Sequence, residues 1–262
     1  MADFDDDCQH FLPFRLEETM KIEILGVKLD DLSQSEVVKL ICSKIRSGEK
    51  FTVVTPNPEF LVTAHRDEDF KKTLGKADLA IPDGVGLVII PRLMGFRPYL
   101  SQRVAGADVV ENILSAAAPE GWRIGVAGAR RGETHEAKEL IERLEVKYRG
   151  IEIENLEDKK DWRNIKYDVI FACQGMGEQE KWIFEYLDKS KSSLYMGIGG
   201  SLDFLAGFSA RAPILLRTIG FEWLWRLMTR PKTHLVRAYR AFFVFPMLLI
   251  KERLSFLFLD PE

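Results

Sequence analysis

The stretch FTVVTPNPEFLVTAHRDEDFKKTLGKADLAIPDGVG, residues 51–86, decides the fold. Apolar runs at 51–54 and 79–81 each end in a turn with proline and polar residues, TPNP after the first run and PDG after the second. Between them, residues 58–73 carry apolar side chains at helical spacing. A strand, a helix and a strand over about thirty residues predict a βαβ unit whose two strands are parallel neighbours.

The polar turns of this unit predict a ligand site. Open α/β sheets bind ligands outside the carboxyl ends of their strands, so Asp83 is expected to face the same space as Thr55 and Asn57. The alternative interpretation is turn chemistry, because Asn and Asp beside Pro and Gly are common turn formers. Asp83 would then only cap the helix that starts near Gly84. The pattern alone leaves both interpretations open.

Composition bounds the class of protein. A chain of 262 residues makes one large or two small domains, and its net charge of −3 argues against a nucleic-acid binder. The three cysteines are too few and too far apart for a metal or disulfide framework, which favours a reducing cytoplasm. The N-terminus is acidic and has no long apolar core, so no signal peptide is expected.

The remaining pattern predicts three segments. Residues 1–19 form an acidic, mobile tail, and the ordered fold is expected to begin at Met20 with a strand-like run, which leaves open a misassigned start codon. Residues 20–210 alternate strands and helices, which predicts an α/β fold with a largely parallel, doubly wound sheet and helices on both faces. Residues 211–262 form a basic, amphipathic helical appendage. Beyond residues 51–54 and 79–81, strands are expected at 122–127, 151–154, 166–173 and 193–196.

A glycine turn after the last expected strand is the best candidate phosphate cradle. Gly199, Gly200 and Ser201 stand directly before a helix, where small residues let backbone N–H groups approach an anion. The turn at 128–132 is a weaker second candidate. Neither matches a dinucleotide or P-loop fingerprint, which disfavours nicotinamide and P-loop chemistry. The alternative for each is a tight turn that needs positive φ.

The composition changes after Arg211, where bulky apolar residues alternate with basic ones. The apolar run at 241–250 is too short to span a bilayer. Basic charge with Trp, Tyr and Phe suits a helix that lies in an anionic membrane interface. The alternative, of comparable weight, is an amphipathic helix packed on the domain or on a subunit partner. The residues expected to contact the membrane are Arg230, Lys232, Arg237 and Arg240.

Several motifs in order resemble the WecG/TagA/CpsF family of bacterial glycosyltransferases over residues 20–239. They are TPNPE, PDGVG, QEKW at 179–182, GGSLDFLAG at 199–207, RAP at 211–213 and FEWLWRL at 221–227. The resemblance implies a Rossmann-like fold and transfer of a sugar from a nucleotide donor to a lipid-linked acceptor, at the inner face of the cytoplasmic membrane. The best-known members move N-acetylmannosamine, or its uronic acid, onto undecaprenyl-diphospho-N-acetylglucosamine, for teichoic acid linkage units or surface polysaccharides. The family's chemistry is regarded as inverting and metal-independent, and a C-terminal appendage is linked to membrane association.

The resemblance also implies roles for individual residues. Asp83 matches the family's proposed catalytic base, and Thr55 and Asn57 match neighbouring polar groups of the pocket. The loop at 95–106 holds Arg97 and Arg103, and a lone arginine usually faces solvent. Arg103 stands in RVAG, similar to the family's RV-x-G, which favours a phosphate or catalytic-site role for Arg103 over Arg97. Gln179 matches a polar residue near the donor. The chain departs from the family at 175–178, GMGE in place of glycine-x-proline-x, which makes the sugar less secure than the reaction class.

These residues suit an inverting transfer without a cofactor. One carboxylate deprotonates the acceptor hydroxyl, and a helix N-terminus with arginines stabilises the leaving UDP. No D-x-D-like motif follows a strand, so no metal is expected. The expected partners are a UDP-sugar, a lipid-diphosphate-linked sugar and an anionic membrane; a homo-oligomer stays open. The alternative function is a non-catalytic nucleotide-binding module at the membrane surface, which would not need an exposed carboxylate at Asp83.

Overall fold

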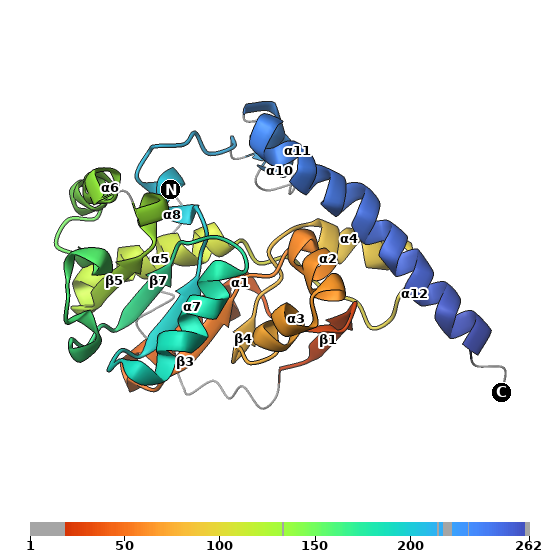
Figure 1. Ribbon diagram of the computed structural model, residues 1–262, viewed down its shortest axis with the longest axis horizontal. Helices are drawn as coiled ribbons and strands as arrows, with labels where there is room; N and C mark the ends of the chain where they lie inside the picture. The colour runs from red at the N-terminus through yellow and green to blue at the C-terminus, as the bar shows by residue number, and fades with distance from the viewer. Residues whose placement is uncertain (1–18, 133, 214, 217–221, 230, 260–262) are drawn as a thin grey trace.

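A six-stranded parallel sheet with the order β4-β3-β8-β7-β5-β6 forms the centre of the fold (Figure 1). The computed structural model describes residues 19–132, 134–213, 215–216, 222–229 and 231–259. The arrangement confirms the predicted Rossmann-like, parallel α/β fold. In sheet order the strands are β4 (Leu79–Ala80), β3 (Phe51–Val54), β8 (Leu194–Gly197), β7 (Val169–Ala172), β5 (Arg123–Ala127) and β6 (Glu152–Asn155).

Helices cover both faces of the sheet. Helices α1, α5, α6 and α8 pack on one face, where Phe51 and Val53 point, while α7 packs on the other. Val54 points to that second face, as alternation along a strand requires, and there meets α2, α3 and α4. Their bounds are α1 Gln34–Ser47, α2 Pro58–Arg66, α3 Glu68–Leu74, α4 Gly86–Leu93, α5 Gly106–Glu120, α6 Thr134–Lys147, α7 Glu178–Tyr186 and α8 Ser201–Leu205. Short 3₁₀ turns lie at Ala129–Gly132, Leu156–Asp158, Trp162–Asn164 and Leu187–Lys189.

The predicted βαβ unit is present, with one difference. Strands β3 and β4 are parallel neighbours, which confirms the prediction from residues 51–86. The expected single helix over 58–73 is two helices, α2 and α3, which meet at Asp67. The side chain of Asp67 accepts a hydrogen bond from the N–H of Phe70 at 2.9 Å. This cap starts a second helix and ends the first one.

The strand-like run that follows Met20 is a hairpin, not a single strand. Strands β1 (Lys21–Ile24) and β2 (Val27–Asp30) pair antiparallel, and the turn residues Leu25 and Gly26 both have positive φ. Such a two-residue turn matches the twist of a hairpin. The buried carboxylate of Asp30 accepts the N–H of Ala80 at 2.9 Å and pairs with Lys21 at 3.1 Å. The hairpin therefore lies against edge strand β4.

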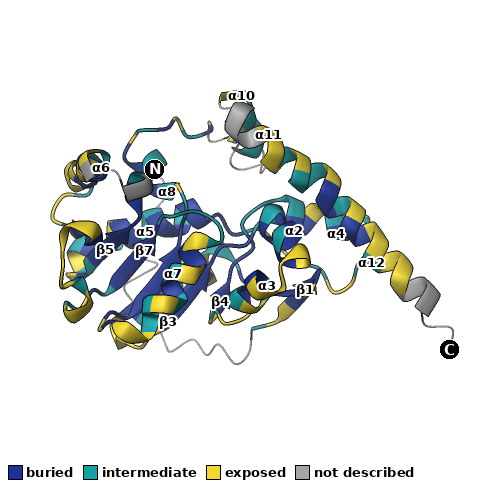
Figure 2. Ribbon diagram, viewed as in Figure 1, coloured by how far each residue is buried: buried dark blue, intermediate teal, exposed yellow. Residues whose placement is uncertain are grey.

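The C-terminal segment is helical and lies across α2 and α4 (Figure 1). It contains α10 (Glu222–Thr229), α11 (Pro231–Tyr239), a π-helical stretch (Arg240–Val244) and α12 (Phe245–Leu259). On the inner face of the segment, Phe245 and Leu249 are fully buried in the same apolar cluster as Phe60 and Leu87 (Figure 2). Within the described residues, no helix is both long enough and apolar enough to cross a bilayer. The division of the chain at residue 210 stays a prediction.

Candidate active site

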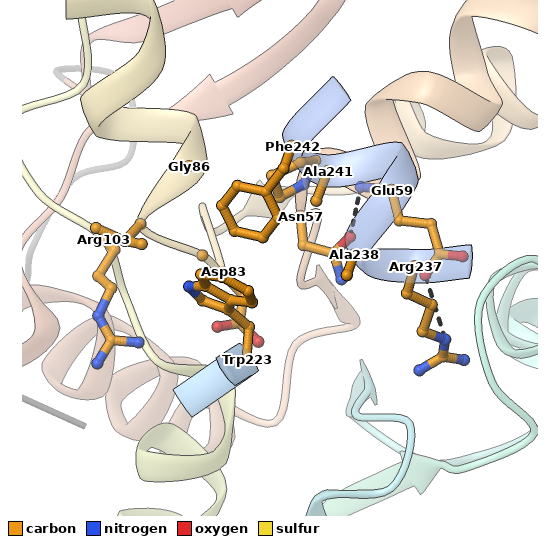
Figure 3. A pocket seen from close by; sticks show the side chains of 13 residues that line it. Asn57, Glu59, Asp83, Gly86, Arg103, Trp223, Arg237, Ala238, Ala241 and Phe242 are labelled. Carbon is orange, nitrogen blue, oxygen red and sulfur yellow. Dashed lines mark hydrogen bonds and ion pairs between the residues drawn. The ribbon is translucent and has the colours of Figure 1, made fainter. Parts of the chain in front are cut away.

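A cavity of about 170 Å³ lies at the carboxyl ends of β3 and β4. The turn after β3 contributes Asn57, and the turn after β4 contributes Asp83. Arg103, from the loop before α5, and the N-terminal residues of α4 complete the core side of the cavity. The structure thus brings together three of the residues singled out as catalytic or substrate-binding from the sequence (Figure 3). Their catalytic and binding roles stay predictions.

Asn57 and Asp83 differ in their local structure. The Asn57 side-chain oxygen caps α2 by accepting the N–H groups of Glu59 at 2.9 Å and Phe60 at 3.2 Å. The presence of Asn57 at this position is therefore explained in part by its role as a helix cap. The capping position of α4 is Val85, so Asp83 lies two residues before it. Its backbone N–H donates to the Pro56 carbonyl at 2.8 Å, which ties the two turns together.

The RVAG segment holds Arg103 beside Asp83. The N–H of Val104 donates to the carbonyl of Pro82 at 2.9 Å, so the arginine loop is fixed to the turn that bears the carboxylate. Gly106 follows at the start of α5, and a Cβ placed there would lie 3.2 Å from Thr55 Cγ2 and 3.4 Å from Asp83 Oδ2. Glycine at this position allows the helix start to approach both turns closely.

Two other predicted binding residues are buried and do not line the cavity, among the residues that the structure describes. The Thr55 hydroxyl donates to the Gly197 carbonyl at 3.1 Å and so joins the ends of β3 and β8. The Gln179 side-chain oxygen accepts the N–H of Gly199 at 2.9 Å. Ser201 donates its hydroxyl to the Ile198 carbonyl at 2.8 Å.

These contacts change the expectation for the glycine turn at Gly199, Gly200 and Ser201. The side chain of Gln179 reaches from α7 into the turn and accepts a hydrogen bond from the N–H group of Gly199, which the sequence analysis expected to bind a phosphate. The turn follows β8, on the far side of β3 from β4. It therefore lies along the same sheet edge as Asp83, but outside the cavity lined by the described residues.

The side chain of Glu180 holds that of Gln179 in position through a hydrogen bond. One oxygen of its carboxylate accepts the Gln179 side-chain N–H at 2.6 Å, and the other accepts the N–H of Gly177 at 2.7 Å. Burial raises the pKa of this carboxyl group, while the two hydrogen bonds oppose the shift. Gly197 leaves room for the pair, since a Cβ there would lie 2.8 Å from Gln179 Nε2. The arrangement fixes the orientation of the glutamine.

The C-terminal helices supply the opposite wall of the cavity. Trp223, Arg237, Ala238, Ala241 and Phe242 line it, and Figure 3 shows Arg103 and Arg237 on opposite sides of Asp83. The rings of Trp223 and Phe242 lie with their centroids 3.9 Å apart.

Two of the arginines expected to contact the membrane also form ion pairs with the core of the protein. Arg237 and Arg240 pair with the carboxylate of Glu59 at 3.4 and 3.3 Å, although the two arginine side chains are 55% and 38% exposed. The Glu59 side chain is only 12% exposed. Arg230 lies outside the described residues, as does the side chain of Lys232.

Sequence reasoning missed Glu59, Trp223 and Phe242 as cavity residues. The sequence did point to Glu59, because this residue stands in the TPNPE motif and in the first turn of a helix. Trp223 likewise stands in the FEWLWRL motif, whereas Phe242 had no such signal, because nothing in a basic, aromatic segment shows which of its side chains turn inward. Among the described residues, no group of three or more His, Cys, Asp or Glu side chains could hold a metal ion.

The fold and the cavity define a Rossmann-like α/β enzyme with a carboxylate at the edge of its sheet. A family model described as "Glycosyl transferase WecG/TagA/CpsF family" matches residues 22–257, and the chain belongs to this family. The chain is 33% identical to an N-acetylglucosaminyldiphosphoundecaprenol N-acetyl-beta-D-mannosaminyltransferase of Bacillus spizizenii, over 68% of this chain and 71% of the relative. It is 28% identical to a protein of the same name from Staphylococcus aureus, over 80% of this chain and 85% of the relative.

Proposed function

We propose that the protein transfers N-acetylmannosamine, or a related hexose, from a UDP-sugar to a sugar carried on undecaprenyl diphosphate. The relatives' names support this acceptor and this sugar. The observation that carries the proposal is the position of Asp83. It lies at the carboxyl end of a parallel sheet, in a cavity that also contains an arginine. We propose a role in cell-surface polysaccharide or teichoic acid linkage-unit synthesis.

The proposed reaction is a single displacement with inversion. The Asp83 carboxylate takes the proton of the acceptor hydroxyl as its oxygen bonds to the anomeric carbon of the donor. The bond between that carbon and the β-phosphate oxygen breaks, and its electron pair leaves with UDP. Arg103 and the glycine turn after β8 would stabilise the charge that develops on the diphosphate, without a metal.

We also propose that the enzyme works on the inner face of the cytoplasmic membrane. An exposed apolar stripe supports this, with members three or four residues apart on the outer face of the C-terminal helices. Its members are Leu235, Tyr239, Phe243, Met247, Ile250 and Leu254. Such a stripe with nearby basic residues suits a helix that lies in the interface of an anionic membrane. The buried inner face of the same helices would keep the cavity next to the lipid-linked substrate.

The test is transfer from a panel of UDP-sugars to a short-chain N-acetylglucosaminyl-diphospho-lipid, with Asp83→Asn as the central variant. This variant should fold normally and lose about 10²–10⁴-fold in turnover, the usual range for a general base. Asp67→Asn is the matched control, because Asn caps a helix as well as Asp does and Asp67 lies outside the cavity. Near-wild-type turnover of Asp83→Asn would exclude Asp83 as the base. A wild-type protein that binds UDP-sugars but transfers none would favour the non-catalytic alternative.

A further inference from the structure

We propose that Trp223 and Phe242 form an aromatic wall against which the sugar ring of the acceptor lies, with its reacting hydroxyl directed at Asp83. This inference rests on the proposed function and names a subsite within it. The two rings lie 3.9 Å apart between centroids, and both line the cavity that contains the carboxylate (Figure 3).

The chemistry of a pyranose ring fits this wall. One face of such a ring presents mainly C–H groups, while the hydroxyl groups point outward around its edge. Aromatic side chains offer a large, rigid apolar surface, and their negatively charged π faces attract C–H groups. Asn57 and Asp83 line the same cavity and suit the hydroxyl groups at the edge of the ring. The cavity thus places an aromatic surface opposite polar side chains.

The cavity is large enough to hold a single sugar ring, since its volume is about 170 Å³. The lipid and the diphosphate of the acceptor would lie outside.

The position of the wall on the C-terminal helices assigns it to the acceptor rather than to the donor. These helices also bear the exposed apolar stripe that we propose lies in the membrane, so a lipid-linked acceptor would reach the cavity from the side of Trp223 and Phe242. The C-terminal helices pack on α2 and α4, which begin at β3 and β4. A general base must contact the acceptor hydroxyl, so the acceptor ring belongs on the side of Asp83 where the aromatic wall lies.

The backbone of the wall is unusual in a way that supports a functional role. Phe242 lies within the π-helical stretch Arg240–Val244, and such insertions are often found at functional sites. The stretch directs Phe242 into the cavity, while Val244 joins the buried apolar cluster. Trp225 is on the same helix as Trp223 but does not line the cavity, and its indole N–H donates to the Ala210 carbonyl at 3.3 Å.

The kinetic test compares Trp223→Leu, Trp223→Phe and Trp225→Leu with the wild type. Trp223→Leu should raise the KM for a short-chain N-acetylglucosaminyl-diphospho-lipid by about 10-fold or more, with the donor KM unchanged. Trp223→Phe should recover most of the loss, because it restores an aromatic face. Trp225→Leu is the matched control on the same helix and should lower the Tm without changing the acceptor KM selectively. A rise in the donor KM alone, or no change in either KM, would overturn the proposal.

A binding measurement separates this inference from the proposed function. Tryptophan emission is recorded with the same acceptor analogue and with a lipid diphosphate that lacks the sugar. The wild type should respond to the sugar-bearing probe, and Trp223→Phe should lose that response. This response without transfer from any UDP-sugar would reject the proposed function and keep the wall. Transfer without the response, or an equal response to the sugarless lipid diphosphate, would reject the wall and keep the function.

Discussion

Two phenylalanines on the C-terminal helices offer a matched test of how this segment is used. Phe243 is 67% exposed, and Phe245 is fully buried against α2 and α4. Phe245→Ala should therefore cost about 3–5 kcal/mol, the usual range for a buried Phe→Ala change. Phe243→Ala should change stability by less than about 0.5 kcal/mol. Burying a whole Phe in an apolar phase contributes about 1.5–3 kcal/mol, so the exposed two-thirds of Phe243 is worth about 1–2 kcal/mol at a membrane, or about 5–30-fold in vesicle affinity.

The assay is co-sedimentation with anionic vesicles, with a melting curve for each variant. Phe245→Ala can open the end of the chain locally, which hydrogen exchange over residues 240–255 would detect. We expect Phe243→Ala to bind vesicles more weakly at an unchanged Tm, and Phe245→Ala to show a lower Tm or faster exchange. If Phe243→Ala instead lowers the Tm and leaves vesicle binding intact, the outer stripe packs against protein, and the membrane proposal is wrong.

Three further predictions follow from the site. Activity should survive chelation by EDTA, because a helix N-terminus and arginines would carry the leaving diphosphate; complete loss that Mg²⁺ or Mn²⁺ restores would contradict this. Glu59→Gln removes the ion-pair partner of Arg237 and Arg240 but keeps every basic side chain, so hydrogen exchange over 231–244 should become faster while binding to anionic vesicles is unchanged. Neutralising Arg230, Lys232, Arg237 and Arg240 together should instead weaken vesicle binding, as added salt does. Weaker vesicle binding by Glu59→Gln would show that docking on the core is required first. The methyl group added by Gly197→Ala would lie 2.8 Å from the Gln179 side chain. We expect this overpacking to lower the Tm and the displaced Gln179 to lower the turnover of the folded variant by about 10²-fold; normal turnover would show that the position of Gln179 does not matter.

The sequence predicted the sheet and the core side of the cavity because both depend on local pattern. Two strands joined by a helix must be parallel neighbours, so the turns with Asn57 and Asp83 had to meet at one edge. The sequence did not predict hydrogen bonds and ion pairs between segments that are far apart in the chain. Gln179 takes an N–H group of the glycine turn, and Glu59 takes arginines from a helix about 180 residues later in the chain. Such pairings depend on tertiary packing, which periodicity does not encode.

The contact between Asp30 and Ala80 has a consequence for solubility. Strand β4 is the edge of the sheet next to the hairpin, and an open strand edge offers N–H and C=O groups to the sheet of another molecule. Asp30 supplies a carboxylate oxygen where a neighbouring strand would place its carbonyl, and the same carboxylate pairs with Lys21. A strand from another molecule would have to displace a buried charge to add to this edge. The hairpin therefore shields this edge from pairing with another molecule at Ala80, which stands three residues before Asp83 in the sequence.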